Sequence, residues 1–404
     1  MRRALSVMIS LMNQRHAMRN LHSAVNALTF LTALAVLLTG CQAAAPSADI
    51  NVQVTQAVQT ALVAIRQTQT ASISPATQTP VVTPTIERTP PALASSFATS
   101  LLDPPATPHT YIQDDCEYLK EKWSSTNSPP GTVVMVVMFH SISKGVATGA
   151  NEISNQTFQK LMNDLHDAGF QAIYMQELQD FLYTNAKIPE RSVLLIQDDR
   201  HAAQNFTDHF LPYYQQWGWP VINGWISSLG GEDPVLQENV ALSQQGWVDY
   251  QAHGVVHNTP MSDSSTDDFL TGELQGSMTN IQKYFNKTPI AIIWPGGGFG
   301  VRPVQFARKF GYQLGFTINA RGPLMYNWIP LADQQDPAHP VAIAEGPVND
   351  PLMVLPRFWD TDARAHIDQV RQIGNEAAAY AAQQKATELE YYDIICAPNY
   401  GAMP

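Results

Sequence analysis

Short apolar runs alternate with helical patterns from about residue 111 to the C-terminus, and this alternation constrains the possible folds most. The run 133–138 (Val-Val-Met-Val-Val-Met) has no polar position, which predicts a buried strand. Similar runs over 171–175, 192–196, 220–226, 248–252, 289–294 and 313–318 predict further strands. Strands alternating with helices over about 270 residues predict a parallel α/β fold, either a barrel or a doubly wound sheet.

Helical patterns occupy the intervals between these strands. Ser154 is placed to cap a helix in which Phe158, Leu161, Met162 and Leu165 share one face. Further helices are expected over 176–182, after the 192–196 run up to about 216, over 267–284 and 303–310, and from about 361 to 385. The chain shows no internal repeat and no glycine-rich phosphate loop after the first strand.

Polar residues follow the strands at their carboxyl ends. The first strand is followed by His140, the 192–196 run by Asp198 and Asp199, the 248–252 run by His253 and His257, and the 289–294 run by Gly296. In an α/β barrel these ends converge on the face where catalysis occurs, which favours the barrel. Taken singly, an Asp-Asp pair is more often a turn or helix cap, and a His-x-x-x-His pair more often lies on the surface or in the core. Their order on successive strands predicts one catalytic cleft.

Residues from about Val133 to Ile318 resemble the polysaccharide deacetylase family, carbohydrate esterase family 4. That family has a strand ending in Thr-Phe-Asp-Asp-Gly, then His-Ser/Thr-x-x-His, then a Pro-Gly or Arg-x-Pro turn. The segments 195–200, 253–257 and 294–296 stand in these places, and Phe139-His140 resembles a Tyr-His motif of the branch that deacetylates poly-N-acetylglucosamine. The resemblance covers a little under half of the chain and implies a distorted (β/α) barrel.

The resemblance assigns a metal site to Asp199, His253 and His257. These side chains would bind one divalent ion and leave positions open for water and the substrate carbonyl. Zinc is the expected ion, with nickel or cobalt as alternatives, because imidazole and carboxylate ligands discriminate poorly among them.

The resemblance also assigns catalytic roles. Asp198 would be the general base toward the nucleophilic water, and His140 the general acid that protonates the leaving amine. The backbone N–H of Gly296, together with the metal, would stabilise the oxyanion. The implied reaction is hydrolysis of an acetamide to acetate and a free amine.

Several positions depart from the motifs. Gln197 replaces an aromatic residue, Arg200 replaces a glycine, and Gly254 replaces Ser/Thr. If that glycine needs a positive φ, arginine costs about 1 kcal/mol or more and the loop must differ. In many members an arginine two residues before the motif's proline orients the base; here that residue is Ile293, so we expect Arg200 or Arg302 to hold Asp198 ionised.

Trp294 and Arg200 are the candidate substrate-binding residues, because their motifs place them at the cleft. Other tryptophans could form a sugar-stacking floor, although packing in the core is favoured for each of them. This second group comprises Trp217, Trp219, Trp225, Trp247 and Trp328.

The N-terminal 40 residues are typical of a secretory signal, with four arginines, no acidic residue and an apolar run at 27–38. The ending Leu-Thr-Gly-Cys resembles a bacterial lipobox, which implies a diacylglycerol on Cys41 and an extracytoplasmic protein anchored to the outer face of the membrane. An ordinary signal peptide cut elsewhere and a single-pass anchor are the alternatives. Residues 41–110 are rich in Ala, Thr and Pro and predict an extended tether, which leaves 111–404 as the catalytic domain.

Removal of residues 1–40 would leave 19 basic and 35 acidic residues. So acidic a surface disfavours nucleic acid as a partner and suits a neutral or cationic glycan. Cys116 and Cys396 lie at the two ends of the expected domain and form either a disulfide or two buried free thiols. A disulfide closing so long a loop would contribute up to ~4–5 kcal/mol.

The favoured function is a monomeric, metal-dependent N-deacetylase of a cell-surface polysaccharide. A poly-N-acetylglucosamine exopolysaccharide is favoured by Phe139-His140, while peptidoglycan, chitin-like oligomers and O-acetylated glycans stay open. A catalytically inactive glycan-binding lipoprotein on the same fold is the alternative. A glycoside hydrolase is disfavoured, because adjacent Asp198 and Asp199 cannot straddle a glycosidic bond at ~5–9 Å.

Overall fold

The computed structural model describes residues 88–149, 151–227, 233–256, 259–337, 339 and 342–403 of the chain. These residues belong to one compact unit, Ile86–Pro404. The expected signal peptide, Cys41, most of the expected tether and His257 lie outside the described residues. Within the described part of the chain, every helix is too short or too polar to cross a membrane.

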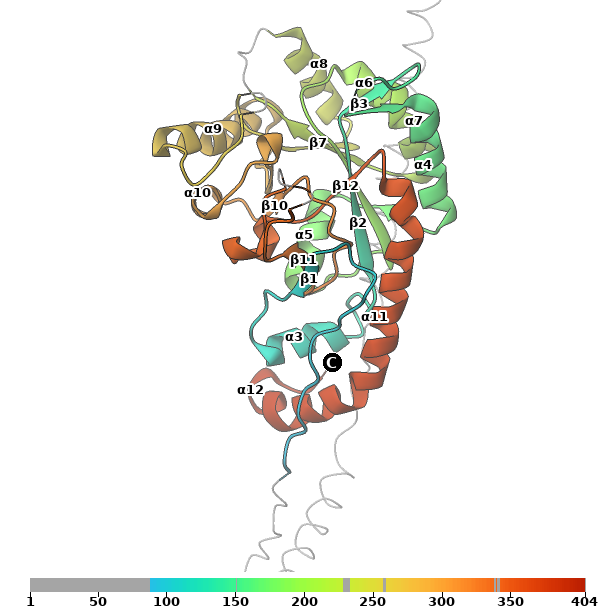
Figure 1. The fold of residues 1–404 in the computed structure, drawn as a ribbon, viewed down its shortest axis with the longest axis vertical. Helices are drawn as coiled ribbons and strands as arrows, with labels where there is room; N and C mark the ends of the chain where they lie inside the picture. Colours follow the sequence, from blue (N-terminus) through green and yellow to red (C-terminus); the bar gives the residue numbers. More distant parts are fainter. Residues whose placement is uncertain are drawn as a thin grey trace, which may run out of the picture. The chain divides into compact units, whose positions relative to one another are not determined.

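A strongly curled parallel sheet of eight strands forms the centre of the fold (Figure 1). Its spatial order is β10-β9-β8-β7-β6-β2-β12, and β5 also pairs with β6. A parallel bridge between Phe316 of β10 and Leu355, just before β12, brings the two edges of the sheet together. The fold is therefore the distorted α/β barrel that the sequence favoured over a doubly wound sheet. The strands are β2 (Val133–Phe139), β5 (Gln171–Ala172), β6 (Arg191–Gln197), β7 (Val221–Trp225), β8 (Val248–Ala252), β9 (Ala291–Ile293), β10 (Leu314–Phe316) and β12 (Phe358–Trp359).

The register of β2 on β6 sets the position of the polar residues that follow them. All seven residues of β2 are buried, as expected for an apolar strand covered on both faces. Phe139 pairs with Gln197 at the ends of the two strands. Because the strands are parallel, His140 and Asp198 leave the sheet side by side at the same end.

Helices surround the sheet, with α9 and α10 on one side and α4, α7 and α11 on the other (Figure 1). On α11, Gly374 allows close packing against the start of β2, because a Cβ there would lie 2.8 Å from the backbone oxygen of Gly131. The α-helices are α3 (Asp115–Trp123), α4 (Asn155–Asp167), α5 (Met175–Thr184), α6 (Ala203–His209), α7 (Leu211–Trp217), α8 (Pro234–Ser243), α9 (Asp267–Phe285), α10 (Val301–Phe310), α11 (Ala363–Tyr391) and α12 (Ala397–Tyr400). The 3-10 helices are η1 (Pro295–Gly297), η2 (Gly346–Val348) and η3 (Pro351–Met353), and η4 (Tyr392–Cys396) is a π-helical segment after α11.

Two helix predictions can be compared in detail. The Ser154 side chain caps α4 by accepting from the backbone N–H of Thr157, as expected. The single helix expected up to about residue 216 is instead two helices, α6 and α7. Pro212 lies in the first turn of α7, where the missing N–H costs nothing, whereas inside one continuous helix it would remove a hydrogen bond.

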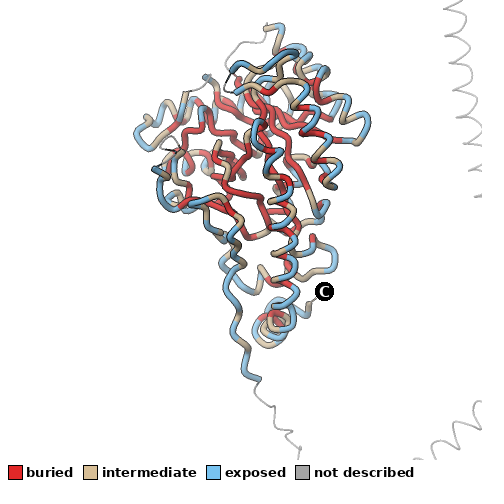
Figure 2. The backbone as a smooth tube through the Cα atoms, turned by 45° about the vertical axis from the view of Figure 1, so that its right-hand side comes forward, coloured by how far each residue is buried: buried red, intermediate tan, exposed pale blue. Residues whose placement is uncertain are grey.

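Two small sheets complete the fold. β1 (Ala106–His109) pairs antiparallel with β11 (Ile329–Ala332), and β3 (Ser141–Ser143) pairs with β4 (Glu152–Ser154). Buried residues are concentrated along the sheet and the inner helix faces (Figure 2). Four of the five tryptophans expected in the core are buried, and the fifth, Trp217, packs against it.

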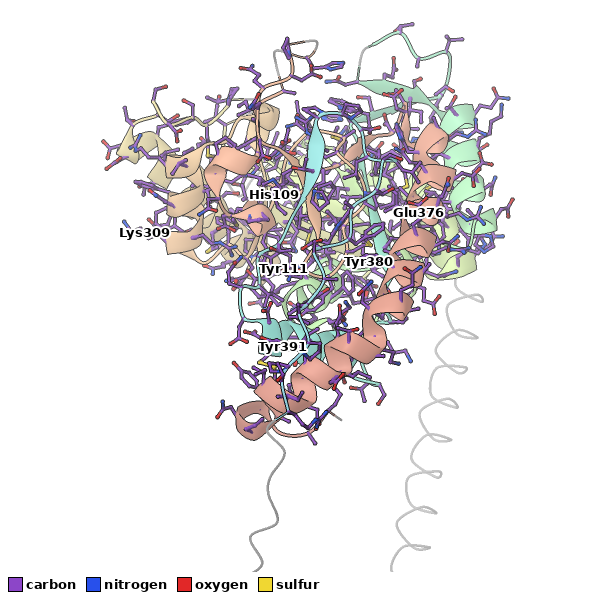
Figure 3. The ribbon with its side chains drawn as sticks, turned by 60° about the horizontal axis from the view of Figure 1, so that its bottom comes forward. His109, Tyr111, Lys309, Glu376, Tyr380 and Tyr391 are labelled. Carbon is purple, nitrogen blue, oxygen red and sulfur yellow. A yellow bond between two sulfur atoms is a disulfide. The ribbon has the colours of Figure 1, made fainter. Side chains whose placement is uncertain are left out.

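The two ends of the domain are joined covalently and by hydrogen bonds. Cys116 of α3 and Cys396 of η4 form a disulfide, so the alternative of two free thiols is wrong. The N-terminal segment lies against α11, where Tyr380 donates to the backbone oxygen of Ser95 and Glu376 accepts from Thr99 (Figure 3). Residues 88–110, which were expected to belong to the extended tether, are therefore part of the compact unit.

Candidate active site

Three polar side chains meet where β2 and β6 end. The backbone N–H of Asp198 donates to Phe139 O at 2.8 Å, which holds the start of the β6 loop against the end of β2. The Asp198 side chain is 2 % exposed, and its Oδ2 lies 3.6 Å from His140 Nε2. Asp199 has a φ of 71°, so the backbone turns sharply between the two aspartates. This turn separates the directions of two adjacent carboxylates.

Arg357, immediately before β12, holds Asp198. Its Nη1 donates to Asp198 Oδ1 at 2.7 Å, and its Nε donates to Thr317 O at 2.7 Å, so the guanidinium is fixed at two points. Burial on its own would raise the pKa of Asp198, but the charge of Arg357, aided by His253 and His140, lowers that pKa below its ordinary value. Asp198 is therefore an ionised carboxylate at neutral pH.

The prediction that Arg200 or Arg302 holds Asp198 is wrong. Arg200 pairs with Asp233 and lies over the ring of Trp225, with its Cζ 4.6 Å from the ring centroid. Arg302 pairs with Asp267, away from the site. Arg200 is not among the residues that line the cavity described below, so its assignment as a substrate-binding residue stays a prediction. The positive φ expected at the motif's glycine falls one residue earlier, at Asp199.

His253 follows β8, and the Nδ1 side of its ring is held by a hydrogen bond to Ile293 of β9. Its Nδ1 lies 2.8 Å from Ile293 O, and because a carbonyl only accepts, Nδ1 carries the hydrogen. The neutral ring therefore presents the lone pair of Nε2, which lies 3.6 Å from Asp199 Oδ1. Burial alone would lower the pKa of His253, but the Asp199 and Asp198 carboxylates raise it above its ordinary value.

The donor atoms of His253 and Asp199 suit a divalent metal ion. Two ligands of a tetrahedral zinc ion with bonds of ~2.0 Å lie ~3.3 Å apart, close to the separation seen here. A histidine ligand commonly donates its other N–H to a backbone carbonyl, as His253 does. Among the described residues, no group of three His, Cys, Asp or Glu side chains could hold a metal. The third expected ligand, His257, lies outside them.

One cavity of about 170 Å³ is lined by His140, Asp198, Asp199 and His253, together with Gly296 and Trp359. Gly296 has a φ of 57° within η1, which permits the tight turn after β9. Trp294 also lines the cavity, but its side chain is fully buried and its indole N–H donates to Met353 O. It therefore forms the wall of the cavity and offers no free face for a sugar ring.

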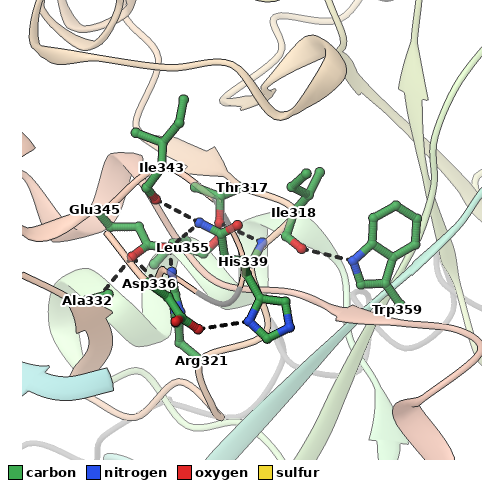
Figure 4. Close-up of polar contacts among 11 residues, drawn as sticks. Thr317, Ile318, Arg321, Ala332, Asp336, His339, Ile343, Glu345, Leu355 and Trp359 are labelled. Atoms are coloured by element: carbon green, nitrogen blue, oxygen red, sulfur yellow. Dashed lines mark hydrogen bonds and ion pairs between the residues drawn. The ribbon is translucent and has the colours of Figure 1, made fainter. Parts of the chain in front are cut away.

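Trp359 and Arg357 are site residues that the sequence analysis missed. The Trp359 ring stacks on His140 with centroids 5.2 Å apart and planes at 12°, and it is only partly buried. Its indole N–H donates to Ile318 O (Figure 4). A signal was present in Pro356-Arg357-Phe358-Trp359, where a single arginine lies among apolar residues, as it does where a buried charge is paired.

A buried ion pair holds the segment around Asn319, which is hydrogen-bonded to the backbone of Arg357. Glu345 pairs with Arg321 and accepts from Asn319 and from the backbone N–H of Ala332 (Figure 4). Asn319 O in turn accepts from the Arg357 backbone N–H. The arginine that holds Asp198 is thus attached to a buried polar network.

A second cavity, of about 380 Å³, lies at the opposite end of β2. It is lined in part by Gly131 and Thr132, which precede that strand, and by residues of α3 and α11. Its buried ionic groups, Lys122 and Glu388, neutralise each other at 2.7 Å. Although it is larger, the reactive side chains gather in the smaller cavity, which is therefore the candidate active site.

Comparison with known proteins was made by sequence and by fold. No family model matches the chain. A curated protein of Bacillus subtilis (strain 168), "Putative polysaccharide deacetylase YxkH", is 25% identical over 201 residues, which are 48% of this chain and 67% of that protein. The chain is similar to a polysaccharide deacetylase. This similarity agrees with the motifs recognised in the sequence.

Solved deacetylase structures have similar but distant folds. The deacetylase PplD of Streptococcus pyogenes, in complex with acetate, matches with a TM-score of 0.47 and 20% identity over 59% of this chain and 98% of its own. BC0361, a polysaccharide deacetylase from Bacillus cereus, matches with a TM-score of 0.45 and 18% identity over 58% of this chain and 69% of its own. IcaB from Ammonifex degensii matches with a TM-score of 0.44 and 16% identity over 60% of this chain and 97% of its own.

Proposed function

We propose that the chain is a metal-dependent hydrolase that removes acetyl groups from an N-acetylated polysaccharide. The observation that carries this proposal is the convergence of Asp198, Asp199, His253 and His140 on one cavity at the carboxyl ends of parallel strands. The similarity to a polysaccharide deacetylase supports the class of substrate.

Asp199 and His253, together with His257, would hold the divalent ion. We propose zinc, with nickel or cobalt as alternatives, since the donor set is imidazole and carboxylate. When bound, the ion would polarise the acetamide carbonyl and lower the pKa of the nucleophilic water. The N–H of Gly296, on the cavity wall, would donate to the developing oxyanion.

Asp198 is proposed as the general base. Arg357 occupies Oδ1, which leaves Oδ2 directed toward His140 and the cavity. The same ion pair keeps the carboxylate deprotonated, so it can take a proton from water at neutral pH. Because Arg357 is itself fixed to Thr317 O, the base is held in one orientation.

His140 is proposed as the general acid. Burial lowers the pKa of His140, and the Asp198 carboxylate offsets this effect only in part. Its imidazolium is therefore a stronger acid than that of an exposed histidine. It lies on the cavity wall beside Asp198, where it can give a proton to the nitrogen of the departing amine.

The chain would act on a polymer outside the cytoplasm. Trp359, partly exposed on the cavity wall, is the proposed platform for a sugar ring. We retain poly-N-acetylglucosamine as the proposed substrate and lipid attachment at Cys41 as the proposed anchor, both on the sequence motifs alone.

Acetate release from N-acetylated oligosaccharides, measured together with metal content, tests the proposal. The wild-type protein should release acetate and a free amine in equal amounts, and chelation should stop the reaction. Asp198→Asn should lose turnover and keep its metal, whereas His253→Ala should lose both. Glycan binding by the metal-loaded wild-type protein without acetate release would instead show an inactive glycan-binding protein.

A further inference from the structure

A buried carboxylate on α9 binds the loop that begins at His253. Glu273 is 3 % exposed, and its Oε2 accepts from the backbone N–H of Val255 at 2.8 Å. The N–H of Val256 lies 3.2 Å from Oε1 and 3.1 Å from Oε2. Two successive backbone donors of the loop thus converge on one side chain from a different element.

Gly254 is required by the same contact. Its φ is 74°, and a Cβ at this position would lie 2.6 Å from Glu273 Oε2 and 2.9 Å from Pro295 Cγ. A serine or threonine, the residue usual in the resembled motif, would therefore collide with the carboxylate. The departure at Gly254 and the presence of Glu273 are two parts of one local arrangement.

If Glu273 only filled space against the loop, a carboxylate would be an unfavourable side chain for that role. An ionised side chain loses several kcal/mol of hydration on burial unless hydrogen bonds replace the water. An apolar residue would fill the same space on α9 without that loss. What the carboxylate adds is direction, because its two oxygens fix the orientation of the peptide groups just after His253.

We propose that Glu273 is a positioning residue for the metal ligand His253. By fixing the backbone of 254–256, it sets the angle at which His253 Nε2 faces Asp199. The inference rests on the proposed function, since it concerns the metal site. Its expected effect is on metal affinity, where residues supporting a ligand are worth about 10- to 100-fold.

The test compares zinc dissociation constants, measured by competition titration, for wild-type protein and three variants, with His253→Ala as the reference for lost binding. Glu273→Gln keeps the size of the side chain but replaces one acceptor oxygen with a donor, and it should weaken zinc binding about 10- to 100-fold. Asp268→Asn removes the same charge from an exposed position on the same helix and should leave binding unchanged. Gly254→Ala disturbs the contact from the loop side and should weaken binding as Glu273→Gln does.

The outcomes separate this inference from the proposed function. Equal zinc affinity in wild type and Glu273→Gln would overturn the positioning role and leave the metal site intact. If Glu273→Gln does not fold, judged by circular dichroism, Gly254→Ala decides: an unchanged dissociation constant overturns the role. Wild-type protein that binds zinc no better than His253→Ala would overturn both the proposed function and this inference.

Discussion

The guanidinium of Arg357 donates a 2.7 Å hydrogen bond to Asp198 Oδ1, and both side chains are buried. The pair joins the loop after β6 to the segment just before β12, which also brings the edges of the sheet together. The residue proposed as the base therefore depends on the part of the chain that completes the barrel.

Replacement of Arg357 by lysine should reduce kcat about 10- to 100-fold, because a point charge cannot hold both Asp198 and Thr317 O. The pKa of Asp198 should rise, since burial is then less fully opposed. The acid limb of the kcat profile should move to higher pH. The matched control is Arg200→Lys, which alters an ion pair outside the cavity and should leave the acid limb in place. An acid limb that moves in Arg200→Lys and not in Arg357→Lys would contradict the assignment.

Trp359 offers a test of the cavity wall. Trp359→Ala removes the ring that stacks on His140 and should lower kcat/KM by up to about 10-fold, the value of an aromatic pair of ~0.5–1.5 kcal/mol. Trp359→Phe keeps a ring and should recover most of the loss. Kinetics on a soluble N-acetylated oligosaccharide would show this order, and equal losses in both variants would argue against a stacking role.

The Cys116–Cys396 disulfide should matter for stability and not for the site. Its loop spans a sequence separation of 280, so removal should lower the free energy of unfolding by up to about 5 kcal/mol, the upper end of the range for disulfides. Urea unfolding of Cys116→Ser/Cys396→Ser, compared with wild type under non-reducing conditions, measures the effect. Zinc affinity should stay the same, because the disulfide joins α3 to the C-terminal turns and neither lines the candidate active site. Equal urea midpoints would contradict the prediction.

The raised pKa of Asp360 should make the free energy of unfolding depend on pH. Burial, with the negative charges of Asp362 and Asp198, raises the pKa of Asp360 from 3.8 to about 7. A raised folded-state pKa means that the folded protein binds the proton more tightly than the unfolded chain. The contribution of Asp360 protonation to the free energy of unfolding is complete below pH ~4 and is lost as the pH rises through 7. The total loss is up to about 4 kcal/mol. Asp360→Asn should remove the dependence and be the more stable protein at pH 8, measured by urea unfolding across pH. Parallel curves for the two proteins would rule out the shift.

Local patterns predicted the parts of the fold that depend on neighbouring residues. The all-apolar run of β2, the Ser154 cap of α4 and the polar ends of β6 and β8 needed only the spacing of residue types. The same logic placed Asp198, Asp199, His253 and His140 together, because parallel strands bring their carboxyl ends to one face. Trp294 was predicted at the cavity but not as a fully buried wall.

What the sequence did not predict depends on contacts between distant segments. Arg357 lies 159 residues from Asp198, and nothing near it in the chain shows that the two-residue strand β12 exists. Arg200 was chosen because it follows the two aspartates, yet the turn at Asp199 directs it toward Trp225 and Asp233. Gly254 appeared to be a departure from a motif until the position of Glu273 on α9 was known.

Anomalous diffraction from crystals of the zinc-loaded protein, collected at the zinc absorption edge, tests the central claim most directly. The account predicts one peak at the cavity, ~2.0–2.2 Å from an Asp199 carboxylate oxygen and from His253 Nε2, with His257 completing the protein ligands. A peak elsewhere, or none at the cavity in protein that releases acetate, would contradict it.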